Sequence, residues 1–173
     1  TVDDLPPGLT LLGTVTTNKD ASEPAAWHMS ENADHLPQAF SRIQANLRFA
    51  SVDTPVSRLL VTSALPGEGK STVAVGLALS FAETGARTVL VDADMRRPRI
   101  ERYMDVEGAV GLADILVGAV EWQDVIQEWG EHGLAVLPAG TKPPNSTLLL
   151  QSRALETFLD ELAPHFDVMI LHS

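Results

Sequence analysis

Short apolar runs alternate with helix-like stretches along most of the chain. The apolar runs are residues 59–63, 88–92, 134–138 and 167–171. They are rich in leucine and β-branched residues and lack the alternation of a half-exposed strand, which is typical of strands buried on both faces. The helix-like stretches between them are residues 70–84, 111–118 and 147–163. This order predicts an α/β fold: a doubly wound, mainly parallel sheet with helices on both faces, in three layers.

The start of the chain has a different character. Residues 1–35 are polar and broken by prolines, apart from one apolar run at 9–15, and we predict a linker there. From Pro37 to Ala50, apolar residues recur at helical spacing. We therefore expect one domain over residues 36–173. Because the last apolar run stops where a loop should begin, we expect this domain to be truncated at its C-terminal end.

Composition narrows the classes of partner. The 173 residues carry a formal net charge of -11, which argues against a nucleic-acid partner, since such proteins usually present a basic face. An acidic protein can still bind one nucleotide through a single loop. The chain has no cysteine, which excludes disulfides, thiolate metal sites and cysteine nucleophiles.

A glycine-rich loop follows the first apolar run. Residues 63–72 read SALPGEGKST, and Gly69, Lys70 and Ser71 match the end of the pattern G-x-x-x-x-G-K-[ST], with Ala64 at its first glycine. Glycines let backbone N–H groups surround a phosphate, and a helix N-terminus favours negative charge. The residues predicted to bind the nucleotide are Gly67, Glu68, Gly69, Lys70, Ser71 and Thr72. The alternative is an ordinary glycine-rich turn between a strand and a helix.

Two carboxylates follow the second apolar run, where Asp92 ends the run and Asp94 comes two residues later. In doubly wound sheets ligands gather at the carboxyl ends of strands, and carboxylates there suit Mg²⁺ and the activation of a hydroxyl. We predict a nucleoside triphosphate and Mg²⁺ at this site, with Lys70, Asp92 and Asp94 as catalytic residues and Ser71 and Asp92 as metal ligands. The alternative is that both aspartates only cap the following turn.

Other candidates are weaker. The five histidines show no metal-ligand spacing, and we interpret them as surface or loop residues, with His172 the exception by its position. Trp122, Val125, Ile126 and Trp129 fall at helical spacing and are expected in the core rather than on a stacking platform. The stretch from residue 147 should be capped by Asn145 or Ser146.

Four segments together resemble the bacterial tyrosine kinases of exopolysaccharide and capsule synthesis. They are SALPGEGKST (63–72), VLVDADMRRPRI (89–100), GLADILVGA (111–119) and VLPAGTKPPN (136–145), and the resemblance covers roughly residues 35–173. Related partitioning ATPases carry a lysine where Leu65 stands, which favours the kinase branch. The run at 9–15 also looks like the stretch just inside the membrane in kinases fused to a chain-length-determining region.

This resemblance implies a P-loop fold, ATP·Mg²⁺ bound at Lys70 and Ser71, and Asp92 and Asp94 serving the metal and the tyrosine hydroxyl. It implies as partners ATP, a membrane chain-length-determinant region and the tyrosine-rich tail of a neighbouring subunit in a homo-oligomer. It also implies a location on the cytoplasmic face of the bacterial inner membrane. The resulting hypothesis is an ATP-dependent tyrosine kinase. The alternatives are a nucleotide-binding regulatory module with little catalysis and a partitioning-type ATPase.

Three departures from the family pattern stand out. His172 takes the place of an aspartate that ends the last strand and serves Mg²⁺, and neutral imidazole is a poorer Mg²⁺ ligand than carboxylate. The helix before the loop carries Gln38, Ser41 and Gln44 where the family has one glutamate and two arginines for contacts between subunits. Tyr103 is the only tyrosine of the sequence.

Overall fold

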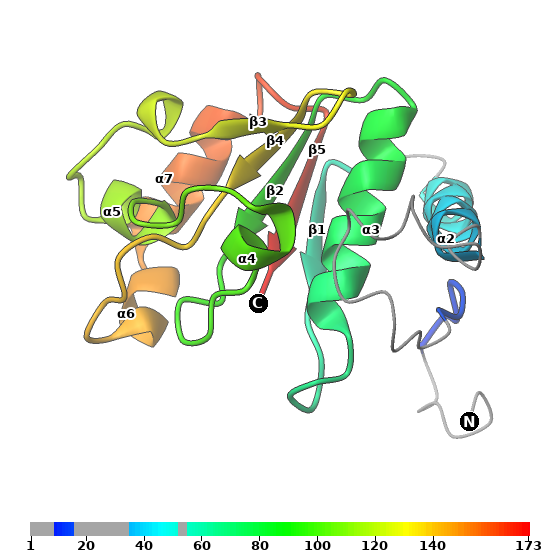
Figure 1. The fold of residues 1–173 in the computed structure, drawn as a ribbon, viewed down its shortest axis with the longest axis horizontal. Coiled ribbons are helices and arrows are strands. Elements are labelled where there is room, and N and C mark those ends of the chain that lie inside the picture. The colour runs from blue at the N-terminus through cyan, green and yellow to red at the C-terminus, as the bar shows by residue number, and fades with distance from the viewer. Residues whose placement is uncertain (1–8, 16–34, 52–54) are drawn as a thin grey trace.

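The computed structural model describes residues 9–15, 35–51 and 55–173, so that most of the predicted linker lies outside the described residues. At its centre is a sheet whose strands run in the order β1-β5-β2-β4-β3 (Figure 1). The strands are β1 (Arg58–Val61), β2 (Thr88–Asp92), β3 (Gln127–Trp129), β4 (Leu134–Leu137) and β5 (Val168–His172). Only β3 is antiparallel to its neighbour; the other pairs are parallel. The predicted mainly parallel sheet is therefore confirmed.

Helices cover both faces of the sheet, as predicted (Figure 1). One layer contains α3 (Lys70–Glu83), α4 (Ile100–Met104) and, outside α3, α2 (His35–Ala50). The other layer contains α5 (Leu112–Leu116), α6 (Ser146–Leu150) and α7 (Arg153–Leu162). In β2, Leu90 packs into the first layer while Val89 and Val91 pack into the second. Among the described residues, no helix is long and apolar enough to cross a membrane.

Burial of the strands follows their place in the sheet. Residues of β2 and β4 are all buried, and β5 is buried apart from partly exposed Leu171, as expected for strands covered on both faces. The prediction is wrong for β1, in which Leu60 is 64% exposed. Within the described residues β1 pairs with β5 alone and lies at the edge of the sheet, so fewer neighbours cover it.

The local structure differs from the sequence analysis, or adds to it, at three places. The stretch 147–163 is two helices, because Ser152 is extended and its hydroxyl donates to the Leu149 carbonyl, a local bond that competes with helix. Asn145 caps the first of them by accepting the Leu148 N–H. Residues 122–129 do not form one helix, since a short 3₁₀ turn (Trp122–Asp124) precedes β3. Helix α4 was not predicted at all, because it has only five residues.

The four residues at helical spacing nevertheless pack into the core, as expected. Val125 is buried, and Trp122 and Ile126 pack beside it. Trp129 packs against the other core cluster, and its indole N–H donates to the Met104 carbonyl at 2.6 Å. This bond ties the edge strand β3 to α4.

Helix α2 is held against α3 by a close approach at a glycine. A Cβ on Gly76 would lie 2.1 Å from Cε2 of Phe40, whose side chain is almost completely buried. One helical turn further on, Ser80 donates a hydrogen bond to the amide oxygen of Gln44 at 2.9 Å. Gln44 is therefore turned inward onto α3.

The contact at Gly76 can be tested because two effects have opposite signs there. Helix propensity alone predicts that Gly76→Ala stabilises the protein by about 0.5–1 kcal/mol. We expect instead a loss of about 1–3 kcal/mol in the free energy of unfolding, because the Phe40 ring has no room to move. Denaturant unfolding measures this, and Phe40→Leu in the same chain should recover part of the loss. A stabilised Gly76→Ala protein would contradict the close packing of α2.

Candidate nucleotide-binding site

The phosphate loop connects β1 to α3 and depends on two glycines. Gly67 and Gly69 have φ angles of 86° and 87°, a region that residues with a Cβ rarely adopt. Gly69 precedes the first turn of α3, where the Val73 N–H donates to its carbonyl. Glu68 closes the loop on itself by accepting the Leu65 N–H at 2.9 Å. The loop therefore presents backbone N–H groups and the N-terminus of a fourteen-residue helix at one place.

Lys70 and Asp94 form an ion pair beside this loop. Their Nζ and Oδ2 atoms are 2.5 Å apart, and the two side chains are 20% and 16% exposed. Burial raises the pKa of the Asp94 carboxyl, but the hydrogen bond from Lys70 and the Arg97 N–H lower it further. The net pKa lies below its ordinary value, so Asp94 is a carboxylate at neutral pH.

Asp92 is a carboxylate with no exposed surface. Its Oδ1 accepts the Asp94 N–H at 3.0 Å, and its Oδ2 accepts the N–H groups of Arg99 and Ile100, each at 3.1 Å. Oδ1 also lies 2.9 Å from Nδ1 of His172. Asp92 thus caps the start of α4, as the alternative from the sequence proposed, and both oxygens have their hydrogen-bond partners.

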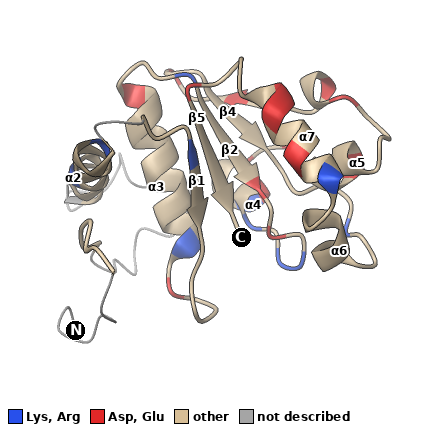
Figure 2. Cartoon of the chain, turned by 180° about the vertical axis from the view of Figure 1, so that it is seen from behind, with Lys and Arg blue, Asp and Glu red and all other residues tan. Residues whose placement is uncertain are grey.

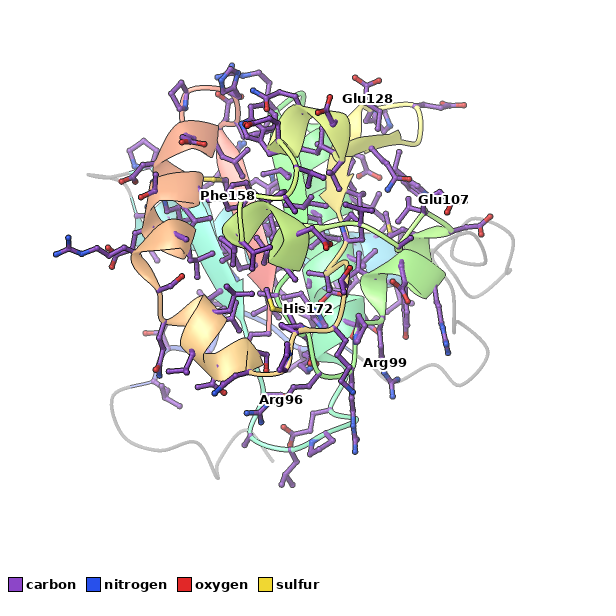
Figure 3. All side chains as sticks on the ribbon, turned by 90° about the vertical axis from the view of Figure 1, so that its left-hand side faces the viewer. Arg96, Arg99, Glu107, Glu128, Phe158 and His172 are labelled. Carbon is purple, nitrogen blue, oxygen red and sulfur yellow. The ribbon has the colours of Figure 1, made fainter. Side chains whose placement is uncertain are left out.

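His172 connects Asp92 to the phosphate loop. It ends β5 between β1 and β2, and it is fully buried. Because the oxygen of an ionised carboxylate can only accept, Nδ1–H donates to Asp92, and Nε2 faces the Ser71 hydroxyl at 2.9 Å. Figure 3 places His172 in the interior, above Arg96 and Arg99. The sequence singled out His172 by position, but its pairing with Ser71 appears only in the fold.

The predicted site residues therefore come together at the carboxyl ends of β1, β5 and β2. Lys70, Ser71, Asp92 and Asp94 form one continuous hydrogen-bonded group with His172. Thr72 instead turns toward α4, where its Oγ1 lies 3.4 Å from the Tyr103 hydroxyl. These contacts are structural findings; the catalytic and binding roles stay predictions.

Charge is unevenly distributed around this group. Figure 2 shows basic residues at the start of α3 and in the loop between β2 and α4, whereas acidic residues crowd α7. The basic residues at that end are Lys70, Arg96, Arg97 and Arg99. The carboxylates of Glu68, Asp92 and Asp94 lie at the same end, so basic and acidic residues nearly balance there in a protein of net charge -11.

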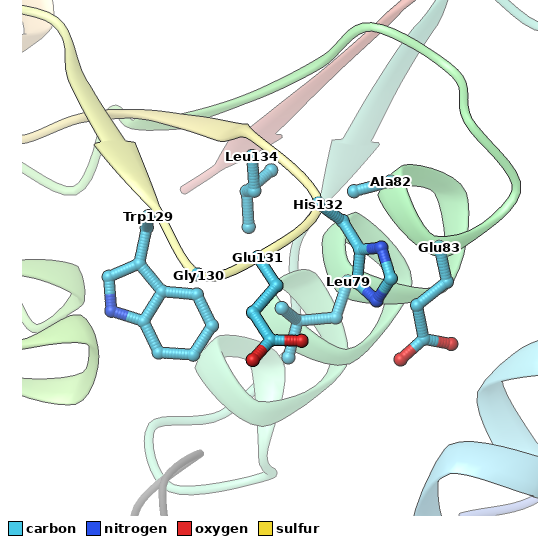
Figure 4. Close-up of a pocket in the computed structure, with 8 residues that line it drawn as sticks. All are labelled: Leu79, Ala82, Glu83, Trp129, Gly130, Glu131, His132 and Leu134. Carbon is cyan, nitrogen blue, oxygen red and sulfur yellow. The ribbon is translucent and has the colours of Figure 1, made fainter.

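A cavity of about 370 Å³ opens next to Asp94. Arg96 forms one side of it and donates a 2.8 Å hydrogen bond to the Thr147 hydroxyl of α6. Another cavity, of about 340 Å³, lies between the last turns of α3 and the β3–β4 turn and is lined by Trp129, Glu131 and Glu83 among others (Figure 4). This second cavity lies at the end of the sheet where β4 begins, whereas the phosphate loop lies at the opposite end, where the parallel strands end. The second cavity is therefore not part of the site.

The donor atoms fit Mg²⁺ poorly. The Ser71 hydroxyl is a suitable oxygen, but both Asp92 oxygens are engaged by N–H groups. The other side-chain atom next to the Ser71 hydroxyl is the imidazole nitrogen Nε2 of His172, whereas Mg²⁺ prefers oxygen ligands. The described residues hold no group of three or more His, Cys, Asp or Glu side chains placed to bind a metal ion.

Sequence reasoning missed Asp114, which joins two of the family-like segments. Its Oδ2 accepts the N–H groups of Gly111, at 2.9 Å, and Thr141, at 3.0 Å. A Cβ on Gly140 would lie 2.3 Å from this oxygen, which explains a glycine there. Asp114 thus anchors the loop after β4 to the start of α5. The sequence GLAD could have indicated this role, because an acidic residue three positions after a helix N-cap often accepts a hydrogen bond from the N-cap N–H.

Comparison with known proteins gives the class of this fold. Residues 56–145 match the ParA family, described as NUBPL iron-transfer P-loop NTPase. The solved chimerical protein CapA2B2 superposes with a TM-score of 0.83 at 32% identity, over 95% of this chain and 70% of that one. The kinase domain of Escherichia coli tyrosine kinase ETK gives 0.85 at 26% identity, over 95% and 69%. The protein is a P-loop NTPase.

A curated relative narrows the class. Tyrosine-protein kinase YwqD of Bacillus subtilis is 36% identical over 142 residues, which are 82% of this chain and 60% of that protein. The chain belongs to the ParA-like P-loop NTPases, and within them the predicted similarity to bacterial tyrosine kinases is confirmed. It spans about 60% of the length of the first curated relatives.

The role of Asp114 can be tested by pH. Burial raises the pKa of its carboxyl, but the hydrogen bonds from Thr141 and Gly111 lower it further, to below the ordinary 3.8. The stabilisation is therefore complete above that value and is lost as the pH falls through the lower, folded-state pKa. At pH 7, Asp114→Ala should lose about 1–3 kcal/mol of unfolding free energy, and the deficit should shrink in acid. The matched control is exposed Asp124→Ala, which should change little at either pH.

Proposed function

We propose that the chain is the ATP-dependent catalytic domain of a protein-tyrosine kinase that regulates synthesis and export of an extracellular or capsular polysaccharide. The observation that carries this proposal is the Lys70–Asp94 ion pair at the mouth of a phosphate loop, 2.5 Å long, on a fold shared with bacterial tyrosine kinases. A phosphate-binding cation and a candidate base are thus held together beside a cavity.

The ion pair suggests how nucleotide binding prepares the site. The β- and γ-phosphates of ATP would draw Lys70 away from Asp94, because they carry more negative charge than one carboxylate. Asp94 would then face the cavity without its partner. A tyrosine hydroxyl entering there would attack the γ-phosphorus in line: its O–P bond forms, the bond to the bridging oxygen of ADP breaks, and the phenolic proton passes to Asp94.

The other residues of the site act through position. Gly67, Glu68 and Gly69 shape the loop, and Ser71 and Thr72 begin α3 behind it. Asp92 orients the segment that carries Asp94, since it accepts the Asp94 N–H. A divalent cation bound with the nucleotide would neutralise charge on the phosphates. Mg²⁺, as expected from the sequence with Ser71 and Asp92 as its ligands, stays a prediction.

The acceptor would be a tyrosine outside this chain. Tyr103 is the only tyrosine in the sequence, and its hydroxyl is directed at Thr72 on the side of α3 and α4. The cavity beside Asp94 offers Arg96 and Thr147 to a passing backbone or an acidic side chain. We propose the tyrosine-rich tail of a neighbouring subunit as the acceptor.

The remaining proposals concern assembly. We propose a homo-oligomer at the cytoplasmic face of the bacterial inner membrane, joined to a chain-length-determinant region. Gln44, at one of the positions where the family is charged, is 5% exposed and bonded to Ser80. Gln38 and Ser41 are exposed and neutral. Contacts between subunits would therefore use other residues than the charged motif of the family.

Lys70→Met tests the proposed chemistry. We expect phosphate transfer from ATP to a synthetic Glu-Tyr copolymer to fall about 100-fold or more, because both the phosphate contact and the pairing with Asp94 are lost. The assay measures labelled phosphate on the copolymer. Exposed Lys142→Met, which removes the same charge from a surface loop, is the matched control and should keep full activity.

The regulatory alternative gives a different result in the same assay. A nucleotide-binding module without catalysis would bind ATP in a Lys70-dependent way and transfer no phosphate, in this chain and in the full-length protein alike. That outcome would overturn the kinase proposal and leave nucleotide binding intact. Failure of the chain to bind ATP at all would overturn both.

A further inference from the structure

We propose that His172 gives this site a preference for a transition-metal cation that readily binds nitrogen ligands, such as Co²⁺ or Ni²⁺. When the nucleotide binds, such a cation would take the place of Mg²⁺. The inference rests on the proposed nucleotide binding and goes beyond it, since it assigns a new metal ligand. The ligands from the chain would be Nε2 of His172 and Oγ of Ser71. The phosphates of the nucleotide and water would supply the rest.

The orientation of the imidazole supports this role. Nδ1–H donates to Asp92 at 2.9 Å, and both residues are fully buried. Histidines that bind metals usually donate their other N–H to a carboxylate in this way, which fixes the ring and makes the free nitrogen a better donor. Asp92 is itself held by three backbone N–H groups, so the ring has a rigid support.

The second ring nitrogen of His172, Nε2, faces the hydroxyl that we propose as the other metal ligand. Nε2 lies 2.9 Å from Oγ of Ser71, at the start of the helix behind the phosphate loop. Two ligands at adjacent corners of an octahedron, each about 2.1 Å from the ion, are about 3 Å apart. The Ser71 hydroxyl and Nε2 could therefore bind one cation once the Ser71 side chain rotates off the Nε2 lone pair, so that two metal bonds replace their mutual hydrogen bond.

Among the described residues, the two neighbouring carboxylates make their hydrogen bonds to groups other than Ser71. Asp92 has no oxygen without a hydrogen-bond donor. Asp94, which the nucleotide would release from Lys70, keeps the Arg97 N–H on Oδ1 and lines the cavity beside Arg96, whereas His172 faces Ser71. Imidazole nitrogen suits Zn²⁺, Ni²⁺ and related ions, whereas Mg²⁺ requires oxygen and releases its water reluctantly. One nitrogen in place of one carboxylate thus changes which cation the same loop prefers.

Calorimetry with a non-hydrolysable ATP analogue tests the preference. Relative to EDTA, Co²⁺ should tighten binding of the analogue by about 10–100-fold, and Mg²⁺ should change it by less than about threefold. In His172→Asp the tightening by Mg²⁺ should increase, and the advantage of Co²⁺ over Mg²⁺ should shrink, because an oxygen ligand replaces the nitrogen. His132→Asp, at an exposed turn, adds the same charge elsewhere and should behave like the unchanged protein.

A spectroscopic measurement tests the ligand itself. In the Co²⁺–analogue complex, the Nδ1–H of a metal-bound His172 should give a strongly hyperfine-shifted proton NMR signal that exchanges slowly, since this group is buried against Asp92. The signal should vanish in His172→Asn. This comparison, like the binding series on the unchanged protein, remains decisive if His172→Asp does not fold beside Asp92.

The outcomes separate this inference from the proposed function. Equal tightening by Mg²⁺ and Co²⁺, no effect of either ion, or no shifted N–H signal overturns the role of His172 while nucleotide binding stands. Absence of nucleotide binding under every condition overturns both. Tightening by Co²⁺ alone, together with the shifted signal, establishes His172 as a metal ligand.

Discussion

The carboxylate of Asp92 is the constraint on which the site depends. A buried charge is costly unless it is fully hydrogen-bonded, and Asp92 meets this requirement with backbone groups of the loop and α4 and with His172 of β5. The same bonds hold the end of β2, the end of β5 and the start of α4 together. Because His172 also reaches Ser71, the phosphate loop is linked to this group through side chains as well as through the chain.

Packing behind the loop gives this group its rigidity. Helix α3 is buried along most of its length between the sheet and α2, and the glycine at position 76 lets the two helices approach closely. The loop at its N-terminus is exposed, however, and is shaped by two glycines in the left-handed region. A rigid helix and an open loop together can hold a ligand at a helix N-terminus without rearranging the core.

The chain shares its fold with bacterial tyrosine kinases, but individual side chains at the site and on α2 differ from the family pattern expected from the sequence. The chain superposes on the chimerical protein CapA2B2 and on the ETK kinase domain with TM-scores of 0.83 and 0.85, so it shares their fold. Two positions where the sequence departs from the expected family pattern are a buried histidine at the end of β5 and a buried glutamine of α2 that faces α3. Both side chains bond inward, His172 to Ser71 and Asp92 and Gln44 to Ser80.

The sequence by itself determined the class of fold, the phosphate loop and the pair of aspartates, because apolar periodicity and the spacing of Gly69, Lys70 and Ser71 are local properties. It could not predict the short helix α4, the exposure of Leu60 or the break at Ser152, which depend on neighbours and single hydrogen bonds. Only the tertiary structure decided that residue 172 meets residue 71 and that Asp114 joins two loops. Parallel strand pairing brings such distant positions together, and no spacing along the chain records it.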